Sequence, residues 1–170
     1  MQDFFEYLNK SIDINDEAKS FISSVIKIRE FKKGDVLITQ GQSEVLNNYF
    51  VLSGCLRSYV IDNNDKEHTV QFAIKDWWIS DYMAYYGKGK AILSVDCLTD
   101  CIVLQTDISS IEKVFKRFPQ IETFHRKNLE KSFVRINKRI VNQFQLNARD
   151  RYLNFIDDFP KMESVAKNFH

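Results

Sequence analysis

The sequence predicts an α+β fold: N-terminal helices, then a roll of short β-strands, then long helices. Between about residues 35 and 107, short β-rich runs alternate with turns made of Gly, Asn, Asp and Ser. On either side of that region, apolar residues recur at steps of three and four, which is helical spacing. The chain has 170 residues, 44% of them hydrophobic, with 14 Phe and 7 Tyr. This is enough for one compact domain with a sizeable core and an additional helical arm.

Two short helices are predicted at the N-terminus, over residues 3–10 and 15–28. The second begins near Asn15, and acidic residues occupy its first turn, where they complement the helix dipole. Strands are predicted over residues 35–39, on both sides of a turn at Ser53-Gly54, over residues 67–74, and on both sides of a turn at Thr99-Asp100. Six or more short strands at this spacing are typical of a sandwich or a barrel-like roll.

Helical spacing returns after residue 107 and predicts three helices, over residues 108–118, 118–146 and 148–158. The middle helix has Pro119 in its first turn and no Gly or Pro after it. Its ~29 residues give a length of about 43 Å, longer than a small domain is wide. We expect part of its apolar stripe to pair with a second copy of the chain, although packing on its own roll is the alternative. The predicted interface residues are Leu129, Phe133, Ile136, Ile140 and Phe144.

Charge and composition exclude several classes of protein. The formal net charge is +1, so no strong field draws the chain to nucleic acid or to a membrane. No stretch approaches the ~20 apolar residues of a membrane-spanning helix. The N-terminus lacks the pattern of a signal peptide. Three cysteines, Cys55, Cys97 and Cys101, lie in apolar surroundings, which favours buried, reduced thiols over a metal or redox site and a cytoplasmic location.

No catalytic or metal-binding pattern is present in the sequence. The three histidines, His68, His125 and His170, fall on a strand, on the long helix and at the chain end, so they do not predict a metal centre. A nucleophile elbow, a P-loop and a paired-carboxylate motif are all absent from the sequence. We therefore expect no enzyme activity, no metal and no cofactor.

Several motifs, in order along the chain, resemble the Crp/Fnr family of bacterial transcription regulators, which includes the catabolite activator protein. They are "FKKGDVLITQG", the "YFVLSGCLRSYVIDNNDKEHTVQF" segment that looks like the family's central hairpin with Gly54 at its turn, "DWWISDY", "FKRFPQI" and "NARDRYLNF". The resemblance covers roughly residues 25–158 and is closest to a subgroup common in Bacteroidetes. It implies a cyclic-nucleotide-binding-type β-roll (a double-stranded β-helix or jelly roll) over residues 1–117 with its N-terminal helices. It further implies a dimerisation helix over residues 118–146 and the start of a linker over residues 147–170.

The resemblance places the phosphate-binding cassette at "DWWISDY" and the segment after it. Cyclic-nucleotide binders of the family use a Gly-Glu pair for the ribose hydroxyl and an Arg-Ser pair for the cyclic phosphate. Here Ser80 and Asp81 match the first pair, and Ala91 and Ile92 match the second. A buried phosphate needs a cation and several donors, and no arginine lies between Arg57 and Arg117. Binding of cyclic AMP is therefore not expected.

Two interpretations of this pocket remain open: a binding site for a less charged effector, or side chains packed as core. On the long helix, Ile136 and Asn137 match the positions that meet the base in the family. Lys90, with Lys88, is a nearby cation in a Gly-containing loop, and a solvated loop lysine is the alternative. The candidate pocket residues are Val70, Phe72, Trp78, Ile79, Ser80, Asp81, Lys90, Ala91, Ile92, Ile136 and Asn137.

The family's C-terminal winged helix-turn-helix, which would read DNA, is expected to be missing after Pro160. A deliberate truncation, an early stop and a frameshift fit this equally well. The function expected from the sequence is thus the sensor and dimerisation part of a Crp/Fnr-type regulator. Its partners are a second copy of itself and a possible small effector, with DNA bound only through a domain that this chain lacks. A ligand-free dimerisation module is the alternative.

Overall fold

The computed structural model describes residues 1–158, which belong to two compact units, Met1–Glu122 and Thr123–His170. The first unit opens with two helices, α1 (Gln2–Asn9) and α2 (Asp16–Val25). Both were predicted from the spacing of their apolar residues. The side chain of Asn15 accepts a hydrogen bond from the Ala18 backbone amide at 2.9 Å and so caps the start of α2.

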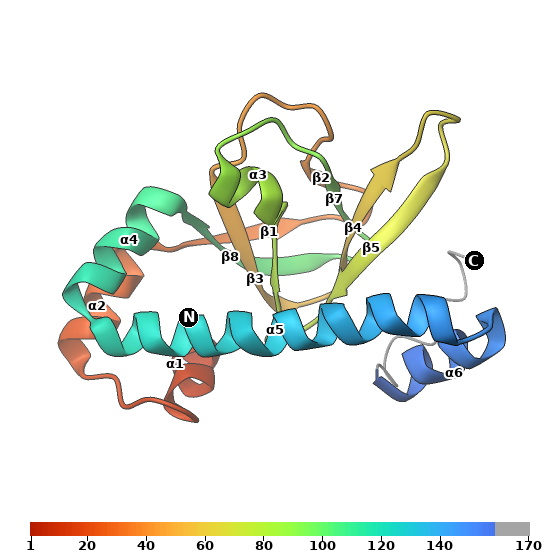
Figure 1. Ribbon diagram of the computed structural model, residues 1–170. Coiled ribbons are helices and arrows are strands. Elements are labelled where there is room, and N and C mark those ends of the chain that lie inside the picture. The colour runs from red at the N-terminus through yellow and green to blue at the C-terminus, as the bar shows by residue number, and fades with distance from the viewer. Residues whose placement is uncertain (159–170) are drawn as a thin grey trace. The chain divides into compact units, whose positions relative to one another are not determined.

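The β-region is a roll made of two four-stranded antiparallel sheets (Figure 1). One sheet has the order β1-β8-β3-β6 and the other the order β2-β7-β4-β5. The strands are β1 (Lys27–Phe31), β2 (Val36–Ile38), β3 (Asn47–Ser53), β4 (Leu56–Ile61), β5 (Glu67–Ala73), β6 (Trp78–Ile79), β7 (Ser94–Cys97) and β8 (Cys101–Asp107). This architecture confirms the predicted fold class.

The core lies between the two sheets. Val51 of β3, Leu56 of β4, Val95 of β7 and Val103 of β8 have no exposed surface and belong to one apolar cluster. Burying such side chains is the main favourable contribution to folding, about 1.5–3 kcal/mol for each one. β3 and β4 each have four consecutive buried residues, and since successive side chains point to opposite faces, both faces of these strands are covered.

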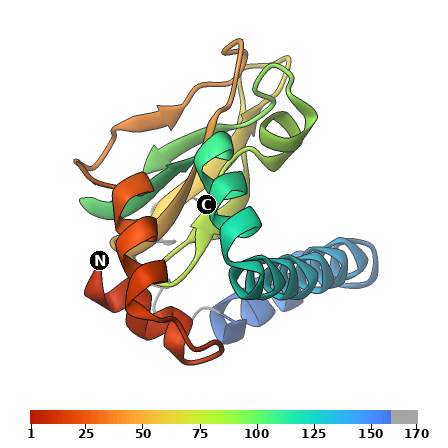
Figure 2. The ribbon, with the colours of Figure 1, turned by 90° about the vertical axis from the view of Figure 1, so that its left-hand side faces the viewer.

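The opposite face of the first sheet is covered by helices, which Figure 2 shows gathered beside the strands. The ring of Phe4 on α1 lies 4.9 Å from the ring of Phe50 on β3, measured between centroids. Helix α4 (Ile108–Arg117) packs with α2, and the ring of Phe21 lies 5.9 Å from that of Phe118. The first of these aromatic contacts attaches α1 to the roll, and the second joins α2 to the end of α4.

Two sequence predictions about the strands were wrong. The helix predicted over residues 15–28 ends at Val25, because Ile26 is extended and β1 then pairs with β8 along its whole length. Its charged, largely exposed residues gave β1 no apolar alternation. The second error concerns Gly54, because β3 and β4 do not form a hairpin with each other: they lie in different sheets, and the turn at Gly54 carries the chain between them.

Glycine is required at position 54. Its φ is +88°, and a Cβ added there would lie 2.3 Å from the carbonyl oxygen of Asp100. The hairpin of this region is instead β4–β5, closed by a turn at residues 62–66 in which Asp65 has a φ of 59°. The residues of this turn suit it, because Asn and Asp tolerate the left-handed conformation.

The C-terminal helices are α5 (Pro119–Gln145) and α6 (Ala148–Asp158), close to their predicted bounds. Pro119 is the first residue of α5, where its missing N–H would have no helical partner in any case. Large apolar side chains of α5 are exposed, including Phe133 at 69% and Phe144 at 85%. None of the helices among residues 1–158 is both long and apolar enough to cross a membrane.

Candidate functional site

The segment that the sequence marks as a phosphate-binding cassette follows β6. It continues through Ser80 and Asp81 into a short helix, α3 (Tyr82–Gly87), and a loop that leads to β7. Helix α3 was not predicted. Asp81 is its N-cap residue, and Asp is one of the preferred residues at that position. The signal in the sequence that could have revealed this helix is Asp81 directly before "YMAYYG", since Asp is a preferred N-cap residue.

Asp81 is fully buried, and its carboxylate accepts four backbone hydrogen bonds. Oδ1 accepts from the amides of Met83 at 3.1 Å and Ala84 at 3.2 Å, in the first turn of α3. Oδ2 accepts from the amides of Ile92 at 2.6 Å and Leu93 at 2.9 Å. Charge-assisted bonds of this kind stabilise a buried carboxylate that would otherwise be costly to desolvate.

This geometry joins the two halves of the sequence-predicted cassette. By the resemblance stated above, Asp81 was expected at the position of the family's ribose-binding carboxylate and Ile92 at the second position of its phosphate-binding pair. In this chain the two positions bond directly to each other through Asp81 Oδ2 and the Ile92 amide. The carboxylate thus supplies the negative charge on which four backbone donors converge.

The neighbouring candidates are also engaged in internal contacts. Ser80 is buried, and its hydroxyl donates to the carbonyl oxygen of Asn47 at 2.8 Å. Ala91 is buried, and its amide donates to the carbonyl oxygen of Gln42 at 2.9 Å, while its own carbonyl accepts from the Gly41 amide at 2.8 Å. Ile79 has no exposed surface. These contacts hold the segment after β6 and the loop before β7 against the rest of the roll.

Three candidates of this region point outward or lie at its edge. Ile92 is 48% exposed, although its amide binds Asp81. Lys90 is exposed, and Lys88, at the C-cap of α3, has a φ of 54° and an exposed side chain. Trp78 is half-buried and packs against Phe50, with ring centroids 5.0 Å apart. The loop lysines are therefore surface charges in this structure.

The remaining candidates lie on other elements. Val70 and Phe72 are on β5, in the second sheet, whereas Trp78 and Ile79 are on β6, in the first. Ile136 and Asn137 are on α5, in the second compact unit. The amide nitrogen of Asn137 donates to the carbonyl oxygen of Phe133 at 2.8 Å, one turn earlier in the helix. The structure thus brings together Ile79, Ser80, Asp81, Ala91 and Ile92.

Sequence reasoning missed the role of Arg57 on β4. Its side chain is buried and forms ion pairs with Asp96 on β7 at 2.7 Å and Glu67 on β5 at 2.8 Å. Its guanidinium also lies 4.1 Å from the centroid of the Tyr59 ring. Burial alone would lower the pKa of Arg57, but the two carboxylates raise it. This buried cation is therefore neutralised by the protein and stays charged.

A surface hollow of about 130 Å³ lies beside β2 and the start of β3. It is lined by Leu37, Ile38, Gln42, Glu44, Val45, Leu46, Asn47 and Tyr49. The predicted pocket residues do not contribute to this hollow. Among residues 1–158, no group of three or more His, Cys, Asp or Glu side chains is arranged to hold a metal ion.

The sequence profile of the cyclic nucleotide-binding domain matches residues 28–118, more than half of the chain. The chain belongs to the cyclic nucleotide-binding domain family. The matched segment runs from β1 through the cassette to the end of α4. No match was found among curated protein sequences.

Solved structures of regulators share the fold of this cyclic nucleotide-binding domain. The c-di-GMP responsive global regulator CLP of Xanthomonas campestris has a TM-score of 0.70 at 13% identity, over 88% of this chain and 74% of that one. The sensor domain of the transcriptional regulator DNR from Pseudomonas aeruginosa has a TM-score of 0.59 at 12% identity, over 75% of this chain and 82% of that one.

Thermus thermophilus catabolite activator protein has a TM-score of 0.57 at 16% identity, over 73% of this chain. The chain spans 59% of the length of that protein. These likenesses agree with the expected resemblance of the domain to the sensor domains of Crp/Fnr regulators. At such low identities these matches show a common fold. Which ligand each domain binds depends on its own residues.

Proposed function

We propose that this chain is the sensor and dimerisation part of a cytoplasmic Crp/Fnr-type transcription regulator, and that its roll does not respond to cyclic AMP. DNA would be bound through a further domain of the regulator. The family match and the regulators that share the fold support the regulatory role. The chemistry of the cassette supports the loss of cyclic AMP binding.

The observation that carries this proposal is the set of four backbone hydrogen bonds to Asp81. A cyclic phosphate would need donors and a cation at this place, but the amides of Ile92 and Leu93 already bind a carboxylate. A second anion next to Asp81 would be repelled by it. The buried arginine of the roll is paired with two carboxylates, so it supplies no free positive charge.

Thermal-shift titration with cyclic AMP and cyclic GMP tests the proposal. We expect no change in Tm up to about 1 mM nucleotide, because a ligand stabilises a protein by an amount set by the ratio of its concentration to its Kd, and we propose that this roll does not bind the nucleotide. The comparison variant combines Ser80→Gly, Asp81→Glu, Ala91→Arg and Ile92→Ser, which puts back the groups that cyclic-nucleotide binders of the family use. A clear shift of the unmodified chain at low-micromolar cyclic AMP would refute the proposal.

Binding of a different effector is the second candidate function. The Xanthomonas regulator of this fold is c-di-GMP responsive, so one roll architecture serves more than one ligand. Cyclic di-GMP and a panel of uncharged and aromatic metabolites belong in the same titration. A response to one of them, with none to cyclic AMP, would identify this chain as a sensor of another molecule; no response throughout would favour a ligand-free dimerisation module.

The proposed dimer uses the exposed apolar side chains of α5. Leu129, Phe133, Ile136 and Ile140 follow one another at steps of four, three and four, and each is more than one third exposed. This is the spacing at which two helices pack in a coiled coil. A second copy of the chain offers the same stripe, so a two-fold pairing would cover both.

A further inference from the structure

Two polar side chains, Asn48 and Thr106, are buried beneath the helices that cover the first sheet. Asn48 lies on β3 and Thr106 on β8, and the two residues are direct partners in the antiparallel register of these strands. Each of them is only 1% exposed. Successive side chains of a strand point to opposite faces, so Asn48 shares a face with Phe50, whose ring packs against Phe4 of α1. The pair therefore lies in the layer between the first sheet and its helices.

The polar atoms of this pair have no hydrogen-bond partner among residues 1–158. They are the side-chain nitrogen and oxygen of Asn48 and the hydroxyl oxygen of Thr106. An unpaired buried donor or acceptor carries the full cost of its removal from water. For this reason nearly all such atoms in folded proteins bind either a protein group or an ordered water molecule. Three of them at one place in a sheet require a common partner.

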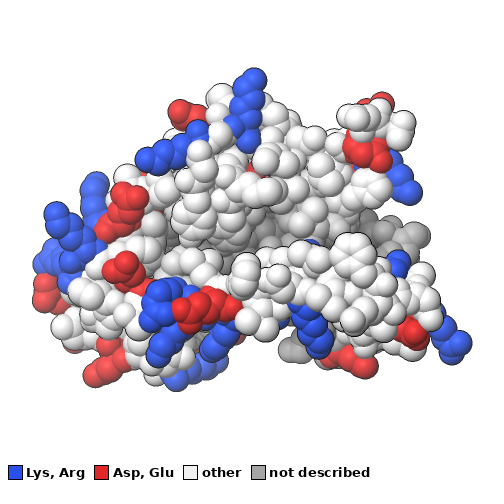
Figure 3. All heavy atoms as spheres, viewed as in Figure 1, with Lys and Arg blue, Asp and Glu red and all other residues white. Residues whose placement is uncertain are grey.

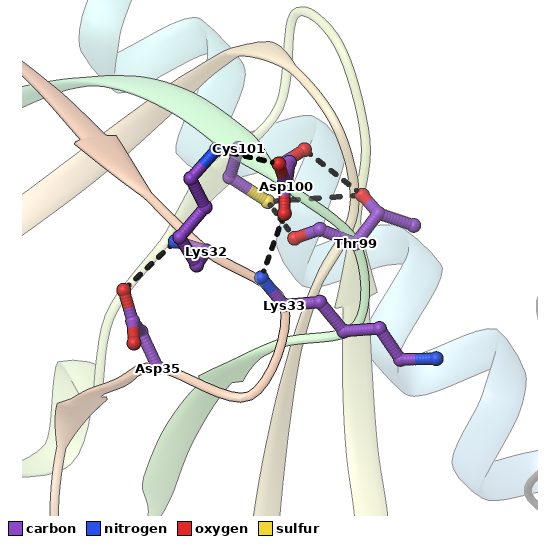
Figure 4. A network of polar contacts seen from close by, with 6 residues as sticks. All are labelled: Lys32, Lys33, Asp35, Thr99, Asp100 and Cys101. Carbon is purple, nitrogen blue, oxygen red and sulfur yellow. Dashed lines mark hydrogen bonds and ion pairs between the residues drawn. The ribbon is translucent and has the colours of Figure 1, made fainter.

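Polar groups at the opposite end of β8 do find partners within the chain. Figure 4 shows Thr99 and Asp100, which precede this strand, beside Lys32 and Lys33. The carboxylate of Asp100 accepts from the Lys32 ammonium group at 2.9 Å and from the Lys33 amide at 3.0 Å. The Thr99 hydroxyl accepts from the amide of Cys55 at 3.0 Å. These groups are partly or fully exposed and still have protein partners, so the unpaired atoms of the buried pair are not typical of the strand.

The pair also has smaller side chains than the neighbouring residues of the same face. Two positions further into the sheet, Phe50 and Leu104 are register partners, and neither has any exposed surface. Asn and Thr side chains reach less far from the backbone than Phe and Leu do. We therefore expect space for a molecule of the size of water between Asn48, Thr106 and the helical layer.

The chemistry of the two side chains limits what can bind there. The amide of Asn48 both donates and accepts hydrogen bonds, and the hydroxyl of Thr106 can do either. Neither side chain is charged, so neither would neutralise a buried ion. Water donates and accepts as well, and internal waters of proteins make about three hydrogen bonds each. This number equals the number of unpaired atoms in the pair.

We propose that Asn48 and Thr106 bind one internal water molecule between the first sheet and its helices. The water accepts from Nδ2 of Asn48 and donates to Oδ1 of Asn48 and to Oγ1 of Thr106. Because helices cover the pair, the water exchanges with solvent only when this layer opens locally, so its residence time measures that opening. The site is separate from the cassette, and it does not depend on the function proposed above.

Magnetic relaxation dispersion of oxygen-17 in water tests the proposal on the whole chain, because it counts internal waters that are held for a long time. The variant that combines Asn48→Leu and Thr106→Val keeps the branching of both side chains and removes all three polar atoms. We expect it to lose one long-lived water relative to the unmodified chain. The control Thr69→Val makes the same change at an exposed position of β5 and should lose none. Equal numbers of long-lived waters in the unmodified chain and the combined variant would overturn the proposal.

A crystal structure of the unmodified chain decides the question if the combined variant does not fold. We expect one ordered water within about 3.2 Å of both Asn48 Nδ2 and Thr106 Oγ1. A direct hydrogen bond between the two side chains, with no water beside them, would overturn the proposal. Side chains that are ordered and still have neither a water nor a protein partner would overturn it as well.

Discussion

At the scale of single residues, Asp81 shows how one buried carboxylate ties together two segments of the roll. A carboxylate one methylene shorter than glutamate stays close to its own backbone and caps the helix that follows it. It also accepts a hydrogen bond from the amide of Ile92, eleven residues later in the chain, in the loop before β7. A side chain that the family resemblance places in a ligand site thus becomes part of the structure of the roll.

Replacing Asp81 should cost much of the stability of the domain. Asp81→Ala removes a helix cap and leaves buried amides without an acceptor, so we expect the free energy of unfolding to fall by about 2–4 kcal/mol. Asp81→Asn keeps one acceptor oxygen and should lose about half as much. Urea unfolding measures both, with the exposed Asp13→Ala as control. Equal stabilities of Asp81→Ala and the control would show that the four bonds contribute little.

Substitutions at two glycines distinguish the cost of a strained backbone conformation from the cost of a steric clash. Gly34 and Gly54 have φ values of +91° and +88°, but an added Cβ meets nothing within 4 Å at Gly34 and meets backbone at Gly54. Gly34→Ala should therefore cost about 1–2 kcal/mol, for the left-handed conformation alone. Gly54→Ala should cost at least about 2 kcal/mol more, because the turn must shift. Similar unfolding midpoints for the two variants would contradict the close packing at the sheet-to-sheet turn.

At the scale of elements, the junction between β8 and α4 depends on the protonation of Asp107. Burial alone would raise the pKa of this N-cap residue, but hydrogen bonds from Ser109 and Ser110 outweigh it and lower the pKa to about 2. A lowered folded-state pKa stabilises the protein above the unfolded value of 3.8, and this contribution is lost as the pH falls towards 2.

Acid unfolding checks this role of Asp107. The unmodified chain should lose stability between about pH 5 and about pH 2 more steeply than Asp107→Asn, because the amide does not titrate. The two curves are compared by urea unfolding at each pH, so that carboxylates common to both proteins cancel. Parallel curves would mean that the cap of α4 does not contribute to the pH dependence.

The sequence predicted the elements whose signals are local. Pro119, the apolar steps after it, and Asn15 with its acidic neighbours marked the starts of α5 and α2 correctly. Strand β1 was missed because its mostly exposed residues show no alternation, and its strand state comes from pairing with β8, far along the chain. The strands that pair with β3 and β4 could not be predicted either. The turn between β3 and β4 does not indicate which other strands each of them pairs with.

In the candidate site, too, the sequence predicted local features but not contacts between distant residues. The sequence showed which groups of a phosphate cassette were absent, and it marked the stretch around Asp81 and Ile92 as one region. It did not show that these residues bind each other, because that contact depends on how the loop after α3 returns to β7. For the same reason, the sequence marked Arg57 only as the last arginine before the cassette, and its two carboxylate partners became visible only with the sheet pairing.

At the scale of the whole molecule, charge does not select a partner for this chain. Figure 3 shows basic and acidic side chains interspersed on the face drawn, in agreement with a net charge of +1. Apolar surface is the stronger signal, and α5 carries it in the second compact unit. A homodimer through α5 is therefore the assembly that we propose.

Substitution on α5 tests the dimer. Ile136→Asp places a charge in the apolar stripe and should shift the chain from dimer to monomer, by at least about tenfold in Kd, because an unpaired charge at such an interface is costly. Lys131→Asp puts the same side chain on the opposite, polar face and should leave the assembly unchanged. Light scattering over a range of concentrations measures both. A monomeric unmodified chain at high concentration would exclude this interface.

We propose that Asp81 occupies the backbone donors of the cassette and leaves none for a cyclic phosphate. Nuclear magnetic resonance of the ¹⁵N-labelled chain observes those donors directly, through the amide signals of Met83, Ala84, Ile92 and Leu93. We predict that the Ile92 and Leu93 amides exchange slowly with solvent, and that cyclic AMP at about 1 mM, a concentration that detects even weak binding, moves none of the four signals. Saturable shifts of these four signals at micromolar cyclic AMP would contradict the claim.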